Sequence, residues 1–324
     1  MKRPCKSLEF AFRGMKIQPP DNLIKLPGVP SGPWKDKYFR MKKLSLIVLA
    51  IALLFAGRNI AIAQSCCRKP TGSDMNALAL NKSFKASHEA PLPFNYTAEK
   101  GSMLQFKIAG GADGNAFYVP ADEPGDKALI IVHEWWGLND YIKKEAEKWQ
   151  QLLGGKVAVY AIDLYDGQVA ATPDEAGKLM NGLDPKRADA IIKGLIQKIG
   201  KDKTIATIGW CMGGSWSFTS AVAAGSEAAG CVMYYGFPEK DLSRIKPLKC
   251  DVLYMRADKD NFIKLPDVEA FGKEVKATGH NFTLHRYDAV HAFANPSNPH
   301  YDAKDAAEAQ ALALKFLKEK LSVE

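Results

Sequence analysis

The chain has 324 residues, of which 47% are hydrophobic and 25% charged, a composition typical of globular proteins and not of disordered or fibrous ones. Its net charge of +8 is concentrated at the N-terminus, because residues 1–63 hold 12 of the 44 basic and 3 of the 36 acidic side chains, a net charge of +9. The remainder carries a net charge of −1, which argues against a nucleic-acid-binding protein.

The basic N-terminal part contains the pattern of an export signal. Met41-Lys42-Lys43 is followed by an uncharged apolar run at residues 44–56 and by a small-residue cleavage site that ends at Ala63. The run is shorter than the about 20 residues of a membrane span. We therefore expect a secretory signal at 41–63, export to the periplasm or medium, and no stable membrane span in the mature chain; an uncleaved anchor or buried helix is the alternative. Residues 1–40 lack periodicity and are interpreted as a non-native or disordered extension.

Six cysteines are present, namely Cys5, Cys66, Cys67, Cys211, Cys231 and Cys250. Cys66 follows the cleavage position, but the leucine usual three residues before a lipidated cysteine is missing, so lipid anchoring is the less favoured alternative. Cys231 and Cys250 lie in or beside apolar runs and are expected to be inert core thiols. No CxxC pair or HExxH motif occurs, so the sequence predicts neither a metal site nor a cofactor.

A polar segment at residues 64–100, interpreted as a linker, precedes a regular alternation of strand and helix patterns. Residues 103–109 and 115–120 flank a glycine-rich turn and predict an antiparallel hairpin. Further strands are expected at residues 128–132, 156–163, 204–208, 231–235, 252–256 and 281–287. Helices are expected at residues 140–153, 174–183, 185–199, 212–224, 266–278 and 301–321, with Asp140 as a capping residue and Pro185 in a first turn. This order predicts one α/β domain over residues 101–324, with a mainly parallel sheet and helices on both faces.

The sequence Gly209-Trp210-Cys211-Met212-Gly213 lies between a predicted strand and a predicted helix. In that context the central residue occupies a tight, strained turn above the sheet, and the flanking glycines let strand and helix approach closely. We therefore predict an α/β-hydrolase fold with Cys211 as the nucleophile; the alternative is a glycine-rich turn around a buried cysteine. A thiol is more nucleophilic than a hydroxyl and ionises nearer to neutral pH.

The order nucleophile, acid, base expected in this fold excludes His88 and His133 as the base. His291 follows the last predicted strand and is our candidate. The remaining histidines, interpreted as strand-face or solvated residues, are His280, His285 and His300.

Two carboxylates, Asp258 and Asp260, compete for the role of the acid after the strand at 252–256. The spacing to the flanking small and β-branched residues favours Asp260, and Asp258 is interpreted as an exposed or capping turn residue. A carboxylate bonded to the imidazole would fix its tautomer and stabilise its protonated form.

With these residues in this order, the chain resembles the dienelactone hydrolase (carboxymethylenebutenolidase-like) family over about residues 101–320. Residues 209–214 resemble its cysteine elbow, 163–165 a segment after one of its strands, and 132–139 its glutamate-bearing loop. The resemblance implies that Glu134 partners the thiol, and that the backbone amides of Trp135 and Met212 form an oxyanion hole. Without the resemblance, Glu134 at the end of a strand is equally well interpreted as a charged loop residue exposed to solvent. His133 is interpreted as a structural neighbour.

The chain departs from the family where substrate is chosen. Members that act on dienelactone bind its carboxylate through arginines, one of them four residues after the histidine, where this chain has Asn295; the helix expected at 174–183 has Lys178 but no arginine. An amide provides neither charge nor a bidentate fork. The aromatic residues suggest an apolar pocket instead, and the candidate substrate-binding residues are Trp136, Trp210, Phe293 and Asn295.

The sequence thus predicts a monomeric hydrolase of small esters or lactones that uses a Cys-His-Asp triad and a thioacyl intermediate. A peptidase or acyltransferase on the same triad is one alternative. A non-catalytic binding protein on a hydrolase scaffold is the other.

Overall fold

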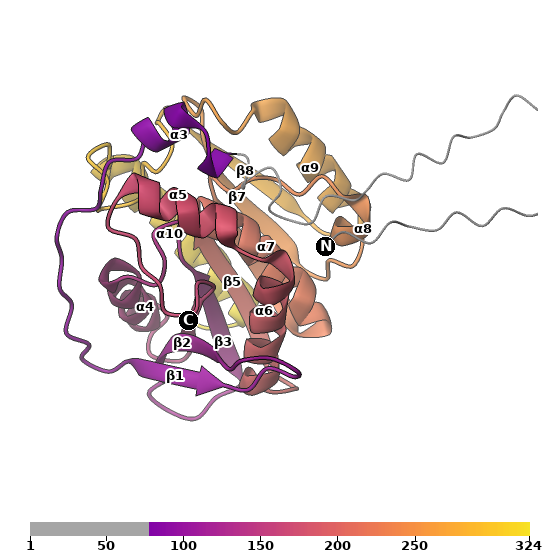
Figure 1. The fold of residues 1–324 in the computed structure, drawn as a ribbon. Coiled ribbons are helices and arrows are strands. Elements are labelled where there is room, and N and C mark those ends of the chain that lie inside the picture. The colour runs from indigo at the N-terminus through magenta and orange to yellow at the C-terminus, as the bar shows by residue number, and fades with distance from the viewer. Residues whose placement is uncertain (1–77) are drawn as a thin grey trace, which may run out of the picture. The chain divides into compact units, whose positions relative to one another are not determined.

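The computed structural model describes residues 78–324 (Figure 1). The interpretations of residues 1–40, of the export signal at 41–63 and of Cys66 lie outside the described residues. Within residues 78–324, no helix combines the length and the apolar character needed to cross a bilayer.

The described residues form one eight-stranded sheet in the order β1-β2-β4-β3-β5-β6-β7-β8. Its strands are β1 (Ser102–Phe106), β2 (Gly114–Val119), β3 (Lys127–Val132), β4 (Ala158–Asp163), β5 (Thr204–Trp210), β6 (Ala228–Tyr234), β7 (Asp251–Ala257) and β8 (Phe282–Tyr287). Strand β2 pairs antiparallel with β1 and β4, whereas all other neighbours are parallel. The predicted hairpin and the mainly parallel sheet are therefore confirmed.

Helices cover both faces of this sheet (Figure 1). They are α3 (Lys82–Ala86), α4 (Asp140–Leu152), α5 (Pro173–Gly182), α6 (Pro185–Ile199), α7 (Met212–Ala224), α8 (Leu242–Ile245), α9 (Leu265–Ala277) and α10 (Ala303–Leu321), with a 3₁₀ turn, η1 (Gly225–Glu227). The order of predicted helices is confirmed, and Pro185 lies in the first turn of α6. One detail was wrong: the side chain that caps α4 is Asn139, not Asp140, because Asn139 accepts the amide of Ile142.

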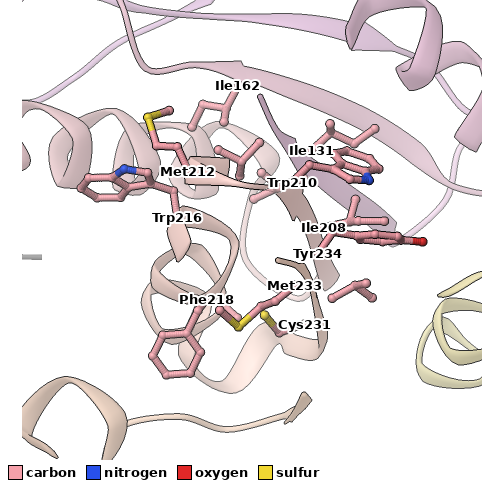
Figure 2. Packing of buried hydrophobic residues seen from close by; sticks show 14 of the residues in the cluster. Ile131, Ile162, Ile208, Trp210, Met212, Trp216, Phe218, Cys231, Met233 and Tyr234 are labelled. Carbon is pink, nitrogen blue, oxygen red and sulfur yellow. The ribbon is translucent and has the colours of Figure 1, made fainter. Parts of the chain in front are cut away.

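The core is continuous across both faces of the central strands. Ile131, Ile208 and Met233 lie on neighbouring strands, and Trp216 and Phe218 of α7 pack near them (Figure 2). Cys231 is buried in this core, where burial raises the pKa of its thiol to about 11. Cys250 is also buried and free, as expected for inert core thiols.

The turn between β5 and α7 is packed tightly against backbone atoms. A Cβ on Gly209 would lie 2.1 Å from the carbonyl oxygen of Gly213, and a Cβ on Gly213 would lie 2.2 Å from that of Val132. The backbone amide of Cys211 donates to Tyr234 of β6, at 3.0 Å. Because backbone atoms cannot yield as flexible side-chain ends can, these two positions require glycine.

We predict that Gly213→Ala lowers the free energy of unfolding by at least about 3 kcal/mol, because the new methyl group meets backbone oxygens on β3. Urea unfolding followed by circular dichroism measures the change. The control is Gly182→Ala at the exposed end of α5, where a Cβ meets nothing within 4 Å and stability should stay within about 1 kcal/mol. Equal stability of the two variants would contradict this account of the turn.

Candidate active site

Three loops at the carboxyl ends of parallel strands bring Cys211, His291 and Asp260 together. Cys211 follows β5 and has backbone angles φ 53° and ψ −121°, in a region that side-chain-bearing residues rarely adopt. His291 follows β8, Asp260 follows β7, and His291 Nδ1 lies 2.6 Å from Asp260 Oδ2. A ring nitrogen of His291 lies within 4.8 Å of Cys211 Sγ. All three side chains are buried.

The loop after β7 holds the carboxylate of Asp260 in place. Its Oδ1 accepts the backbone amides of Phe262 at 2.7 Å and Ile263 at 3.1 Å, which leaves Oδ2 for the imidazole. Burial opposes ionisation of Asp260, but the attraction of His291 and these hydrogen bonds prevail and lower its pKa. The carboxylate is therefore ionised beside the imidazole.

The charge of His291 follows from its two neighbours. Burial alone would lower its pKa, but the electrostatic interactions with Cys211 and with Asp260 prevail and hold that pKa well above the ordinary value of 6.5. The imidazole of His291 is thus favoured in its charged form between Cys211 and Asp260.

The competing carboxylate, Asp258, has a different role in the structure. It forms ion pairs with Arg256 and Arg286, the latter at 2.7 Å. Burial opposes its ionisation, but the hydrogen bonds from Arg286 and Arg256 prevail and lower its pKa. The structure therefore brings Asp260, and not Asp258, to the imidazole.

Glu134 lies at the same site, in the loop after β3. Its Oε2 accepts a hydrogen bond from Nδ2 of Asn295, whereas its Oε1 is buried without a hydrogen-bond partner among the described residues. Burial raises the pKa of Glu134 to about 7, opposed by His291 and by Asn295. Asn295 Oδ1 accepts the amide and hydroxyl of Ser297, so its polar atoms are already committed.

The resemblance implies an oxyanion hole formed by the backbone amides of Trp135 and Met212. Met212 is the first residue of α7, where amides lack intrahelical acceptors. Neither amide donates a hydrogen bond to another residue of the described chain. Both amides thus remain candidates for the predicted oxyanion hole.

The candidate substrate-binding residues separate into two groups. Trp210 and Asn295, together with Glu134, line a pocket of about 460 Å³. Trp136 and Phe293 are not part of its lining, and Phe293 is fully buried between the rings of Tyr235 and Tyr287. The side chain of Phe293 thus belongs to the core.

The other histidines considered in the sequence lie away from these contacts. His133 is buried, its Nδ1 lies 2.6 Å from the carbonyl oxygen of Glu134, and its Nε2 accepts the amide of Leu164. It is a structural neighbour. His280 and His285 are half-buried at β8, and His300 is exposed.

Two residues of the segment interpreted as a linker lie at the site, and sequence reasoning missed both. Phe84 of α3 is fully buried against Trp135, Phe262 and His291. His88 follows α3, and its ring centroid is 5.1 Å from that of His291. Burial lowers the pKa of His88 to about 3, so its ring is neutral. Asn81 as a helix cap, with Phe84 and His88 one turn apart, was the signal available in the sequence.

This fold and the strained elbow at Cys211 define an α/β-hydrolase. The model of the dienelactone hydrolase family matches residues 115–321, and the chain belongs to that family of hydrolases. It is 28% identical over 228 residues to a protein of Aquifex aeolicus provisionally named carboxymethylenebutenolidase, covering 67% of this chain and 98% of that one. It is 25% identical over 203 residues to carboxymethylenebutenolidase 1 of Cupriavidus pinatubonensis, covering 58% and 84%.

Solved structures support the fold. A dienelactone hydrolase-like promiscuous phosphotriesterase from metagenomic libraries superimposes with a TM-score of 0.57 at 20% identity, over 68% of this chain and 98% of that one. The family match begins at residue 115, so α3, Phe84 and His88 lie outside it.

We predict that Glu134 makes stability fall as pH rises. A carboxyl whose folded pKa is raised contributes stability that is present below its unfolded pKa, near 4.5, and lost as pH rises through about 7. The free energy of unfolding of the wild type should therefore fall relative to Glu134→Gln, by up to about 3 kcal/mol between pH 4.5 and 8. Denaturant titrations across this range measure it. Glu308→Gln, at an exposed site on α10, is the matched control, and a pH-independent difference for Glu134→Gln would contradict the prediction.

Proposed function

We propose that the chain hydrolyses small, neutral esters or lactones, with Cys211 as nucleophile, His291 as acid and base, and Asp260 as the group that orients the imidazole. The observation that carries the proposal is the 2.6 Å contact between His291 and Asp260 beside a cysteine on a strained elbow. The family to which the chain belongs supports the reaction class. The carboxymethylenebutenolidase relatives support the ester or lactone bond.

The proposed reaction has two halves. The Cys211 thiolate attacks the acyl carbon and forms a C–S bond, and the amides of Trp135 and Met212 stabilise the oxyanion. Collapse breaks the C–O bond to the leaving group, which takes the proton of the His291 imidazolium. Water then attacks the thioester while His291 takes its proton, and cleavage of the C–S bond releases the acid and restores the thiolate.

The preference for neutral substrates follows from the charges around Cys211. Glu134 and Asp260 are buried carboxyl groups, and no arginine lies among the residues that line the described pocket. Asn295 holds the position of a family arginine, but its amide is bonded to Glu134 and Ser297. Lys144 and Lys148 line the pocket, but a substrate carboxylate would lack the bidentate partner that an arginine provides, so we place neutral acyl groups above dienelactone.

We predict that Asp260→Asn lowers kcat/KM for p-nitrophenyl acetate by about 10²–10⁴-fold, because the imidazole loses the partner that fixes its orientation and stabilises its charge. Asp258→Asn, which alters a neighbouring ion pair, should lower it less than about tenfold. Steady-state kinetics on folded protein, checked by circular dichroism, measure both. A larger loss in Asp258→Asn would reassign the acid.

We also predict that Cys211 is acylated during turnover. Rapid acid quench followed by mass spectrometry should show an acetyl group on the peptide that contains Cys211, and His291→Ala should abolish turnover. Cys231→Ser is the matched control and should retain the acetylated peptide. Turnover that survives in Cys211→Ala would contradict the proposal, as would an acetyl group found only on another cysteine.

Peptide amides and added acyl acceptors distinguish ester hydrolysis from a peptidase or acyltransferase activity that uses the same residues. Faster cleavage of peptide amides than of esters would favour a peptidase. Transfer of the acyl group to an added amine or alcohol in preference to water would favour an acyltransferase.

A further inference from the structure

His88 adds a third metal-ligating side chain to the two that the proposed reaction uses. It comes from the segment that precedes the family-matched residues, and it is 3% exposed. One ligand atom from each of His88, Cys211 and His291 can be chosen so that all three lie within 4.8 Å of one another. These residues lie far apart in the chain, and the fold alone brings them together.

Both imidazoles present the same free nitrogen. His88 Nδ1 lies 2.7 Å from the carbonyl oxygen of Phe84, and His291 Nδ1 lies 2.6 Å from Asp260. With Nδ1 engaged in each ring, Nε2 is the remaining ligand atom. The Nε2 of His88 is buried without a hydrogen-bond partner among the described residues, whereas the Cys211 side chain acts on the remaining nitrogen of His291. The proposed reaction accounts for the nitrogen of His291 beside Cys211, but it does not account for the buried, unpartnered nitrogen of His88.

We propose that His88 Nε2, Cys211 Sγ and His291 Nε2 bind a zinc ion. Zinc bonds of about 2.0–2.1 Å to nitrogen and about 2.3 Å to sulfur place tetrahedral ligand atoms about 3.3–3.6 Å apart. The three ligand atoms lie within 4.8 Å of one another, so small side-chain rotations would bring them to these distances. Three protein ligands leave the fourth position for water or a small anion.

The surroundings match a soft or borderline cation and not magnesium or calcium. Imidazole and thiolate ligands favour zinc, cobalt and cadmium, whereas the hard cations favour oxygen ligands. The carbonyl of Phe84 and the carboxylate of Asp260 stand behind the two imidazoles, as outer partners of metal-binding histidines usually do. The carboxylate of Asp260 adds negative charge behind His291.

Zinc at this position would inhibit the reaction. It would occupy the thiolate lone pair that attacks the substrate and the nitrogen that transfers the proton. The proposed metal site does not depend on the proposed function, whereas inhibition by zinc rests on the proposed function. Metal binding and hydrolysis should therefore be measured separately.

Cobalt titration of the full-length, reduced, chelator-treated protein tests the site. We expect one equivalent of Co²⁺ to give the visible absorption of a tetrahedral ion and a thiolate-to-cobalt charge-transfer band. Cys211→Ser should remove the charge-transfer band. His88→Gln should weaken affinity for Co²⁺ by about 10–100-fold or more, and zinc should displace the cobalt. His300→Gln, at an exposed histidine, is the matched control and should bind as the wild type does.

Three outcomes would overturn the site: no tetrahedral spectrum, a charge-transfer band that survives Cys211→Ser, or equal affinities for His88→Gln and His300→Gln. Circular dichroism shows whether each variant is folded. In a parallel assay, zinc should inhibit hydrolysis of p-nitrophenyl acetate, a chelator should restore it, and His88→Gln should need at least about tenfold more zinc. A cobalt spectrum without esterase activity would disprove the proposed function and leave the metal site intact.

Discussion

The close approach of β5 to α7 is the constraint on which the site depends. Gly209 and Gly213 leave room for the strand and helix backbones to meet, and the turn between them forces Cys211 to a positive φ. That conformation is unfavourable for a cysteine, so the surrounding packing must maintain it. Its result is a thiol at a helix N-terminus, beside the loops after β7 and β8. The chemistry at this position is therefore a consequence of backbone packing.

Burial raises the pKa of both carboxyl groups at this site, and their different partners decide the net direction of the shift. Asp260 has an imidazolium and two backbone amides as partners, and its pKa is lowered. Glu134 has one amide of Asn295 on one oxygen and no partner among described residues on the other, and its pKa is raised to about 7. In the same low-polarity surroundings, the partners of Asp260 thus keep it ionised, whereas Glu134 can exchange a proton near neutral pH. Two carboxyl groups with separated pKa values can serve distinct roles in one reaction.

Local sequence signals were sufficient for most of the fold. Apolar runs, caps and the glycine elbow are encoded within a few residues, so the strands, helices and chain order could be predicted to within a few positions. The choice of Asp260 over Asp258 rested on spacing in one loop, and the structure brings Asp260 to the imidazole. Adjacent capping residues such as Asn139 and Asp140 differ too little for sequence to separate them. The place of Phe293 in the core depends on Tyr235 and Tyr287, which are distant in sequence.

His88 shows why the rest could not be predicted. Its segment is polar enough to be interpreted as a linker, and the order of residues in an α/β-hydrolase concerns the triad alone. Its position depends on Phe84 packing against Trp135 and Phe262, contacts between residues far apart in the chain. Burial in this aromatic cluster keeps the imidazole neutral, and the Phe84 carbonyl orients it toward the site. A segment outside the family match therefore changes which ligands the cysteine and histidine inside it can share, and motif and fold alone do not define the chemistry of this site.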